Sequence, residues 1–475
     1  MRKKKVIIIG GGASGLTAAV FAAEGGADVT VLEHTASIGK KLLSTGNGRC
    51  NYTNSELKDK SAIRRHYHSL SNIGFAEKVI ENFGYEDTLS FFKRIGVEPK
   101  FRKYSYDDSS YVYPASDQAS SVLRALKQQA DAHNVRFITS CNICNVAHIN
   151  TSPCTSLFVV DAENASYRSD ALIVCTGGGA APKTGSDGSG FNFPCAFGHT
   201  MWGFLPSLCP LKCPEHFFKD IKGVRHECNV KLFISSTGDS EHTEETRLAK
   251  HNESTADNFG FITDDKLEDT YESFGEVQFT DYGISGIPVF QISRYASIAL
   301  KIGKAVRAEL DLMPGMAEAE LSDLLYERSL LLSDRTLEYF FNGLLNDKLS
   351  KLILSLASLK PFMGVYTLER KDTDKLSRLL KHFSVTVEDT AGFDSAQCTV
   401  GGIDAGEIDP DTMESEVISD LYFAGELIDI DGDCGGYNLQ WAWSTGAIAG
   451  KNAADYHKKK AYPEIFENNV MKDEK

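Results

Sequence analysis

The sequence predicts an α/β fold with a dinucleotide-binding domain that is interrupted by an inserted β-rich and helical domain. Three observations predict it. The chain begins with a strand, a glycine turn and a helix; an acidic residue ends the following strand; and segments of the same type return near the C-terminus, after about residue 390. Strands that alternate with helices are typical of parallel sheets.

The first element is a strand of mostly β-branched residues that breaks into a glycine-rich turn, VIIIGGGASG at residues 6–15. Gly10 suits a tight turn, Gly12 allows a pyrophosphate to approach the backbone, and Gly15 allows the helix and the strand to pack closely. Residues 16–23 are apolar and alanine-rich, which indicates a helix. The free N–H groups and positive dipole end of that helix suit phosphates.

The second element is an extended run at residues 29–32 that ends at Glu33. This acid follows the first glycine by about twenty residues, where a Rossmann-type domain places a carboxylate on a ribose hydroxyl. Strand, glycine turn, helix and acid together predict a bound dinucleotide. The alternative is a glycine-rich turn that binds nothing, and these motifs alone do not distinguish NAD from FAD.

The third element is a polar, glycine-rich loop, GKKLLSTGNGRCNYTN at residues 39–54. A loop of this kind suits an extended cofactor such as FAD, whereas an ordinary surface loop is the alternative interpretation. Cys50 has no CxxxxC partner, which excludes the dithiol relay of disulfide reductases, and we expect its thiol to pack beside the cofactor. Arg49 offers a cation to an anionic substrate or to the reduced cofactor.

Several segments closely resemble one family of flavoproteins. They are TGNGRCNYTN (45–54), LIVCTGGGAAPKTGSDGSG (172–190) and LYFAGELIDIDGDCGGYNLQWAWSTGAIAG (421–450), together with residues 412–415 just upstream of the last. The chain resembles the BaiN/YhiN family, also called 3-dehydro-bile-acid Δ4,6-reductase-like. The resemblance implies FAD as the cofactor and a Rossmann-type, glutathione-reductase-like FAD-binding domain.

The last block also predicts a second helix N-terminus beside the cofactor. Residues 421–424 indicate a buried strand, and residues 437–450 a helix that Gly435 and Gly436 open. In FAD enzymes of this fold such a terminus typically faces the flavin, where its dipole stabilises negative charge on the reduced ring. A helix that only packs in the core is the alternative, and both roles are compatible.

These motifs together give the candidate site residues. We expect the cofactor to contact Gly10, Gly12, Ala13, Ser14, Gly15, Glu33, Lys41, Ser44, Gly46, Asn47, Gly48, Arg49, Cys50, Thr176, Gly177, Gly178, Gly425, Glu426, Asp431, Gly436, Tyr437 and Asn438. The catalytic candidates are Arg49, Cys50 and Tyr437, and Asp429 is a further candidate for cofactor contact or proton supply. We assign no metal site.

The order of the motifs predicts four segments: an FAD-binding part at 1–195, a β-rich lobe at 196–310, a helical lobe at 311–389 and the rest of the FAD-binding domain at 390–475. Strand-like stretches at 229–235 and 276–280 precede a turn-rich segment at 281–288, and helical periodicity follows at 321–332 and 349–359. We expect the substrate pocket between the FAD-binding domain and the insertion.

The resemblance to the family also covers one position in the insertion and one element before it. Asp281 stands where the family usually has a histidine, which puts an inherited proton-donor role there in doubt. The family's aromatic–proline element is Tyr113-Pro114, which either packs or lines a flat apolar pocket.

Composition predicts a soluble enzyme. The chain has 475 residues, 42% of them hydrophobic and 24% charged, and its net charge of −15 argues against a nucleic-acid partner. The N-terminal MRKKK precedes an apolar run that glycines interrupt, which argues against a signal peptide, and no stretch is long enough to span a membrane. We therefore expect a cytoplasmic protein with reduced thiols among its eleven cysteines. The acidic residues 238–276 suggest a solvated insertion.

The leading functional hypothesis is an FAD-dependent oxidoreductase. We expect it to pass hydride from NADH or NADPH, bound transiently, through FAD to a small organic acceptor such as an activated C=C bond. One alternative is an FAD-dependent amine oxidase that produces peroxide, and another is a flavin-binding sensor or tRNA-modification partner. The sequence gives no prediction of the oligomeric state.

Overall fold

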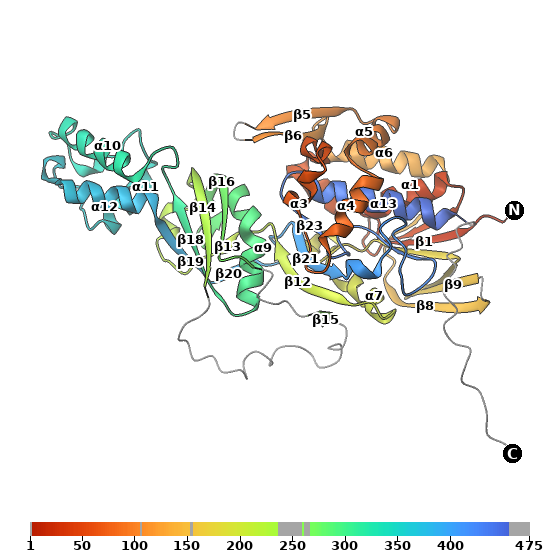
Figure 1. Cartoon of the computed structure of the whole chain (residues 1–475). Coiled ribbons are helices and arrows are strands. Elements are labelled where there is room, and N and C mark those ends of the chain that lie inside the picture. Colours follow the sequence, from red (N-terminus) through yellow and green to blue (C-terminus); the bar gives the residue numbers. More distant parts are fainter. Residues whose placement is uncertain (1, 105–106, 153–154, 236–258, 261–266, 456–475) are drawn as a thin grey trace, which may run out of the picture.

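The centre of the molecule is a sheet of five parallel strands in the order β22–β11–β1–β2–β7. The computed structural model describes residues 2–104, 107–152, 155–235, 259–260 and 267–455 (Figure 1). The strands of this sheet are β1 (Lys5–Ile9), β2 (Asp28–Leu32), β7 (Arg136–Ile138), β11 (Ala171–Val174) and β22 (Leu421–Phe423). Most of their side chains are buried, as expected for a parallel sheet with both faces covered.

Helices cover one face of this sheet and a small antiparallel sheet covers the other (Figure 1). The helices are α1 (Ala13–Glu24), α6 (Ala119–Ala132) and α13 (Tyr437–Ala454), and the strands are β8 (Ile143–Ser152), β9 (Thr155–Ala162) and β10 (Ala165–Ser169). Gly446 lets α1 and α13 approach closely, because a Cβ there would lie 2.4 Å from the carbonyl oxygen of Ser14. The two helices that begin at the cofactor motifs are thus packed against each other.

Short elements complete this domain. The helical ones are α2 (Lys40–Ser44), η1 (Thr45–Gly48), η2 (Ser55–Lys58), α3 (Ser61–His66), α4 (Ile73–Asn82), α5 (Tyr85–Arg94), η3 (Pro182–Thr184), η4 (Ser189–Phe191), α7 (Asn192–Ala196) and η10 (Ala405–Glu407). The strands are β3 (Thr53–Asn54), β5 (Pro99–Tyr104) and β6 (Asp107–Pro114), which form one sheet, and the pair β4 (Tyr67–His68) and β23 (Asp431–Gly432). The pair joins two segments far apart in the sequence.

A second, antiparallel sheet has its own core. Its seven strands run in the order β19–β18–β14–β16–β17–β13–β20, and its buried residues form a cluster separate from that of the parallel sheet. The strands are β13 (Leu211–Lys212), β14 (Arg225–Ser235), β16 (Thr270–Phe279), β17 (Gly283–Ser285), β18 (Ala305–Asp311), β19 (Phe383–Val387) and β20 (Asp389–Thr390). Helices α8 (Phe218–Ile221) and α9 (Ile287–Lys301) accompany it, and α9 lies on the side of the parallel-sheet domain (Figure 1).

The remaining helices follow β18 in the chain and end before β19. They are α10 (Glu318–Leu331), η8 (Leu337–Tyr339), α11 (Asp347–Leu356), η9 (Val365–Thr367) and α12 (Arg370–Lys381). Because β18 and β19 are hydrogen-bonded neighbours, this helical segment leaves and rejoins the sheet at the same edge. It forms the far end of the molecule (Figure 1).

Two paired strands connect the domains. Strand β12 (Met201–Ser207) pairs antiparallel with β21 (Cys398–Ile403), and β15 (Phe259–Gly260) extends this small sheet. Between them the chain forms the antiparallel sheet and its helices. The four boundaries predicted above remain predictions, while the interrupted α/β architecture is confirmed.

Three local predictions need correction. The segment at 39–54 is not one loop, because it contains α2 and η1; the turn-rich segment at 281–288 contains β17 and the start of α9. The acidic stretch 238–276 ends in strand β16, which begins at Thr270, while residues 236–258 and 261–266 lie outside the described residues. Within the described residues, no helix is both long enough and apolar enough to cross a membrane.

Candidate functional site

A cavity of about 910 Å³ follows the ends of the parallel strands. It begins at the glycine turn after β1, passes the loop after β2 and the start of α13, and reaches α9 of the antiparallel-sheet domain. Ligand sites of open α/β sheets lie at this edge, beyond the carboxyl ends of the strands. The cavity therefore joins the predicted cofactor motifs to the boundary between the domains.

The glycine turn has the geometry that its sequence predicts. Gly10 has φ 101°, and a Cβ there would lie 2.3 Å from the carbonyl oxygen of Cys175; a Cβ on Gly15 would lie 1.9 Å from the carbonyl oxygen of Gly10. A Cβ on Gly12 would meet nothing within 4 Å, and Gly12 lines the cavity. Two of the glycines are thus required by packing, while the third leaves open space for a pyrophosphate.

Glu33 holds its carboxylate at the cavity through two backbone donors. Its Oε2 accepts the N–H of Gly11 and its Oε1 accepts the N–H of Thr35, each at 2.8 Å. A carboxylate has lone pairs left after two such bonds. Glu33 is therefore oriented by the fold and able to accept a ribose hydroxyl.

Two helix N-termini meet the cavity without a side-chain cap. Gly12 precedes α1 and Gly436, with φ 100°, precedes α13, and neither glycine has a side chain that could cap its helix. Ala13 and Ser14 at the first terminus, and Asn438 at the second, line the cavity. Uncapped N–H groups and the helix dipole make both termini suitable for negative charge on a ligand.

Lys41 and Glu426 pair across one side of the cavity. Lys41 Nζ lies 2.6 Å from Glu426 Oε2, and Glu426 Oε1 accepts a hydrogen bond from the Thr399 hydroxyl at 2.9 Å. The Thr399 hydroxyl in turn accepts the N–H of Gly179 at 2.9 Å. The two predicted cofactor residues thus stabilise each other and join segments from four parts of the chain.

Among the residues that the structure describes, two buried polar atoms on the cavity wall have no hydrogen-bond partner. They are Asn51 Oδ1 and Thr176 Oγ1, and both residues line the cavity. A buried polar group without a hydrogen bond costs free energy, so such groups indicate a ligand or water that supplies the partner. With the glycine cradle, the acid and the helix termini, the site fits an FAD-sized dinucleotide.

The structure brings most predicted cofactor residues to this cavity, but not all. Those that line it are Gly10, Gly12, Ala13, Ser14, Glu33, Lys41, Ser44, Gly46, Asn47, Arg49, Thr176, Gly177, Gly425, Glu426, Gly436 and Asn438. Those that do not line it are Gly15, Gly48, Cys50, Gly178, Asp431 and Tyr437. Gly178 packs behind the wall, since a Cβ there would lie 2.3 Å from Thr399 Oγ1.

Cys50 does not take the position expected for it. Its side chain is fully buried away from the cavity, and its φ of 62° belongs to the left-handed region. Burial raises the pKa of the thiol to about 12. The thiol therefore stays protonated at neutral pH and packs in the core rather than beside a cofactor.

A cluster that the sequence analysis missed borders the cavity at Asp433. Asp433 lines the cavity and accepts hydrogen bonds from two imidazoles, His66 Nδ1 at 2.9 Å and His68 Nε2 at 3.0 Å. The other ring nitrogen of His66 contacts Glu56, and the His66 ring stacks on Tyr437 at 4.3 Å between centroids. His66 ends α3 and His68 ends β4, with Tyr67 between them, and both imidazoles reach Asp433.

The antiparallel-sheet domain supplies the apolar end of the cavity. Ile287 and Phe290 of α9 line it together with Leu208, and Tyr113 from the predicted aromatic–proline element lines it on the opposite domain. Helix α9 is held there by Gln291, whose side-chain oxygen accepts the N–H of Cys434 at 2.8 Å. These positions support the expectation of a substrate pocket between the domains, which stays a prediction.

The acids before α13 differ in their surroundings. Asp431 forms a buried ion pair with Arg294 of α9, and Asp429 Oδ2 accepts the N–H groups of Leu70 and Ser71 at 2.8 and 2.6 Å. Burial raises the pKa of Asp429 to about 7. Asp281 lies elsewhere, exposed and paired with Lys222 at 2.8 Å, so it has no place at the cavity.

Comparison with known proteins identifies the family. The sequence matches the family described as HI0933-like protein Rossmann domain over residues 4–452. The chain belongs to this family. The 3-dehydro-bile acid delta(4,6)-reductase of Clostridium scindens is 37% identical over 453 residues, which are 95% of this chain and 99% of that protein. The resemblance stated from the motifs is therefore confirmed.

Two more distant relatives have a different name. The ribosomal RNA dihydrouridine synthases of Haemophilus influenzae and Escherichia coli are 27% and 25% identical, and the matches cover 92% and 94% of this chain and 96% of each relative. Among solved structures, the 3-ketosteroid-delta4-(5alpha)-dehydrogenase of Rhodococcus jostii RHA1 matches 95% of this chain and 97% of its own, with 14% identity and a TM-score of 0.46. As a member of the HI0933-like family, the chain is an FAD-dependent oxidoreductase.

Proposed function

We propose that this HI0933-like protein reduces a C=C bond conjugated with a carbonyl in a small, apolar, ring-shaped substrate. The observation that carries the proposal is the continuity of the cavity from the cofactor motifs to the apolar residues Leu208, Ile287 and Phe290 between the domains. A concave site with apolar walls and few polar groups suits such a substrate. The inserted domain then determines which substrate fits.

The chain's residues hold FAD at stated points. Glu33 would accept a ribose hydroxyl, the N–H groups of Ala13 and Ser14 would donate to the pyrophosphate, and the N-terminus of α13 would lie at the flavin ring system. When bound, FAD supplies hydride-transfer chemistry. The dipole of α13 stabilises negative charge that develops on the reduced cofactor.

The names of the relatives support this bond class. The name 3-dehydro-bile acid delta(4,6)-reductase describes C=C bonds reduced in a ring system that bears a 3-oxo group. The name dihydrouridine synthase describes the addition of hydrogen to a uracil ring, whose C=C bond is also conjugated with a carbonyl. For this chain we favour a small molecule over RNA, because a net charge of −15 opposes binding to phosphates.

We further propose that NADH or NADPH reduces the cofactor after transient binding. The sequence has one fingerprint with a ribose-binding acid, and Glu33 of that fingerprint serves FAD. A transiently bound nicotinamide needs no second domain of this kind. We also expect a cytoplasmic protein, where both nicotinamide cofactors are available.

An anaerobic visible spectrum of the purified protein tests the proposal. We expect a flavin spectrum that bleaches with NADH or NADPH and returns when a 3-oxo-Δ4 steroid or another enone is added. Bleaching by an amine alone, with peroxide formed in air, would establish the amine oxidase instead. Recovery of the oxidised spectrum with uridine-containing RNA and not with enones would assign the acceptor to RNA. Failure to bind flavin at all would overturn the proposal.

A further inference from the structure

The cluster around Asp433 contains a chain of proton-bearing groups that ends at the cavity. Asp433 lines the cavity beside Cys434 and Gly435, at the start of α13. Behind it, His66 Nδ1 lies 2.9 Å from Asp433 Oδ2, and the opposite nitrogen of the ring contacts Glu56 Oε2. Hydrogen bonds thus run from Glu56 through the imidazole to the carboxylate on the cavity wall.

The backbone fixes this arrangement. Strands β4 and β23 pair so that Gly432 lies opposite Tyr67, and the N–H of Asp433 donates to the carbonyl oxygen of His66 at 2.9 Å. Tyr437 supports the imidazole from α13, because its ring stacks on His66 and its hydroxyl donates to Glu56 Oε2 at 3.3 Å. The relative positions of the carboxylate and the imidazole therefore do not depend on long, mobile side chains.

The two carboxylates that face His66 favour its protonated form. Burial alone lowers the pKa of His66, but the hydrogen bond to Asp433 and the charges of Asp433 and Glu56 outweigh burial and raise it. Burial raises the pKa of Asp433, but hydrogen bonds from His66 and His68 outweigh it and lower the value. The groups that face His66 are Glu56, Asp433 and the Tyr437 ring, with His68 on the far side of Asp433.

We propose that Asp433 and His66 form the proton relay that completes reduction of the substrate; the inference rests on the proposed function. With FAD bound and reduced, its hydride would form the new C–H bond at the carbon distal to the carbonyl, and the C=C electron pair would move toward the carbonyl. The proton of His66 Nδ1 passes to the Asp433 carboxylate, which delivers it to the carbon next to the carbonyl. His66 regains a proton from solvent on the Glu56 side. Two electrons and two hydrogens are added in all.

Asp433 is the catalytic residue in this scheme because it lines the cavity that the substrate would enter. His66 and Glu56 are positioning residues, which orient Asp433 and restore its proton after each turnover. A merely structural cluster would affect folding and FAD content, and would leave the pH dependence of the acceptor step unchanged. Two readouts separate these roles: the rate at which prereduced enzyme is reoxidised by an enone, and the NMR titration of His66 in protein without flavin.

The test compares Asp433→Asn, Glu56→Gln and wild type, with His382→Asn as the matched control. His382 is also an imidazole between two carboxylates, Glu309 and Glu318, but it is exposed on the antiparallel-sheet domain away from the cavity. We expect Asp433→Asn to slow reoxidation about 100-fold or more, with reduction by NAD(P)H unchanged. We expect deuterium from solvent at the carbon next to the carbonyl, and His382→Asn to behave as wild type.

The dependence of the acceptor step on pH provides the second part of the test. The relay requires protonated His66, so the acceptor step of wild type should slow as pH rises through the raised pKa of His66. Glu56→Gln removes one carboxylate that raises this pKa, so the decline should begin at lower pH, and the NMR titration of His66 should move in the same direction. This variant keeps the test open if Asp433→Asn does not fold.

Distinct outcomes overturn the two proposals separately. If wild type reduces an enone and Asp433→Asn does so at the same rate, or if the Glu56→Gln profile and titration coincide with wild type, the relay is wrong while the proposed function stands. Parallel loss of both half-reactions together with FAD in both Asp433→Asn and Glu56→Gln also overturns the relay, in favour of a structural role. If no enone reoxidises wild type, the proposed function fails and the relay fails with it.

Discussion

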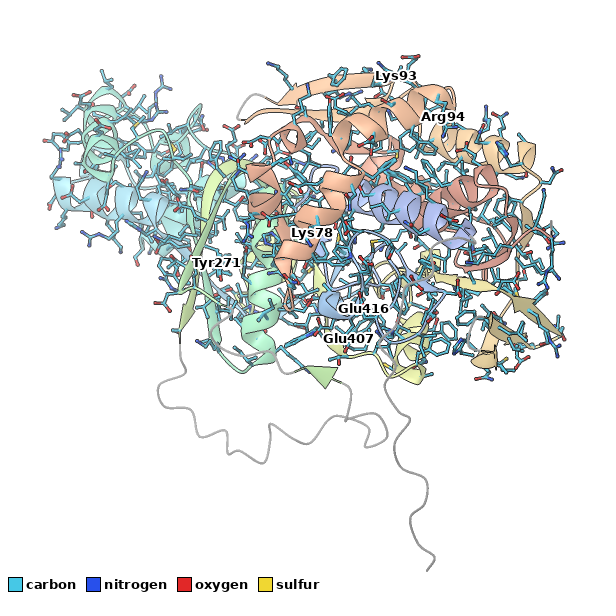
Figure 2. All side chains as sticks on the ribbon, turned by 45° about the vertical axis from the view of Figure 1, so that its right-hand side comes forward. Lys78, Lys93, Arg94, Tyr271, Glu407 and Glu416 are labelled. Carbon is cyan, nitrogen blue, oxygen red and sulfur yellow. The ribbon has the colours of Figure 1, made fainter. Side chains whose placement is uncertain are left out.

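Arg294 of helix α9 and Asp431 of strand β23 form a two-point ion pair across the boundary between the domains. Arg294 Nε lies 3.0 Å from Asp431 Oδ2 and Arg294 Nη2 lies 3.0 Å from Oδ1, while the side chains are 7% and 2% exposed. The pair therefore fixes α9, which carries Ile287 and Phe290, against the segment that leads to α13. Figure 2 shows the neighbouring Tyr271 on β16, whose ring stacks on Tyr295 of α9 at 3.5 Å between centroids.

Breaking this pair should destabilise the protein strongly. Arg294→Met leaves Asp431 as a buried, uncompensated charge, which costs about 3 to 5 kcal/mol. The urea midpoint should fall by a corresponding amount. Arg294→Met combined with Asp431→Leu should recover most of the loss, because no isolated charge remains. The surface pair Arg64–Glu77 is the control: Arg64→Met should leave the midpoint nearly unchanged, and an equal effect of both substitutions would contradict the interpretation.

Substitution of Gly12 should affect cofactor binding, whereas substitution of Gly15 should affect folding. Gly12→Leu fills open space in the cavity and should weaken FAD binding by at least about tenfold, with an unchanged thermal midpoint. Gly15→Ala places a Cβ against the backbone of Gly10 and should destabilise the fold by about 1 to 3 kcal/mol. Titration of the deflavinated proteins with FAD, together with thermal unfolding, distinguishes the two effects. Normal FAD affinity in Gly12→Leu would place the pyrophosphate elsewhere.

The buried carboxyl group of Asp429 should make the free energy of unfolding decrease as the pH rises. Burial, with a contribution from the charge of Asp431, raises the pKa of Asp429 in the folded protein to about 7 from an ordinary 3.8. The folded state then binds the proton more tightly than the unfolded state, so a penalty is absent below about pH 4 and grows until about pH 7. Within that range, the free energy of unfolding should fall by about 1.4 kcal/mol for each step of one in pH. Asp429→Asn should gain stability relative to wild type between pH 5 and 8 in urea unfolding; a constant difference would contradict the raised pKa.

The thiol of Cys50 should be unreactive in the native protein. Its buried thiol, with a pKa of about 12, is protonated at neutral pH, whereas Cys144 is exposed. A maleimide should therefore label Cys144 before Cys50 in the native protein, as measured by mass spectrometry of peptides. Cys50→Ala should keep flavin reduction and reoxidation within about twofold of wild type. Rapid labelling of Cys50 with loss of turnover would restore it as a catalytic residue.

Arg49 should contribute to substrate binding. It lines the cavity with an exposed side chain, so the guanidinium can meet the carbonyl or an anionic group of the acceptor. Arg49→Ala should raise KM for the acceptor about tenfold, with kcat changed less, because a hydrogen bond to a charged group is lost. Arg124→Ala, an exposed arginine on α6, is the control. Unchanged KM in Arg49→Ala would remove the residue from the site.

Local motifs allowed much of the cofactor site to be predicted. The turn from Gly10 to Gly15 and the acid Glu33 lie within one strand–helix–strand unit, where spacing alone determines which atoms meet. The start of α13 at Tyr437 also follows from the two glycines before it. In both places the chemistry depends on neighbours in the chain, so one sequence is sufficient.

The proton cluster and the domain contact depend on distant neighbours. His66 and Asp433 are separated by 367 positions, and Arg294 and Asp431 by 137, so no spacing in a single sequence indicates that they touch. The burial of Cys50 was unpredictable for another reason: its φ lies in the left-handed region, and a non-glycine residue gives little sequence signal of that conformation. The contact of Glu407 (Figure 2) with His199 was unpredictable for the same reason as the His66–Asp433 contact, because the two residues are 208 positions apart.

The pairing of β12 with β21 has a consequence for how this architecture changes. Ser207 lies opposite Cys398, so the chain departs from the cofactor domain and comes back to it through two directly facing residues. A different segment with equally close ends can stand between them, provided that it replaces the contacts of Arg294 and Gln291 with Asp431 and Cys434 before α13. New substrates can therefore be acquired by replacing one exchangeable unit, while the apparatus for electron transfer is inherited intact.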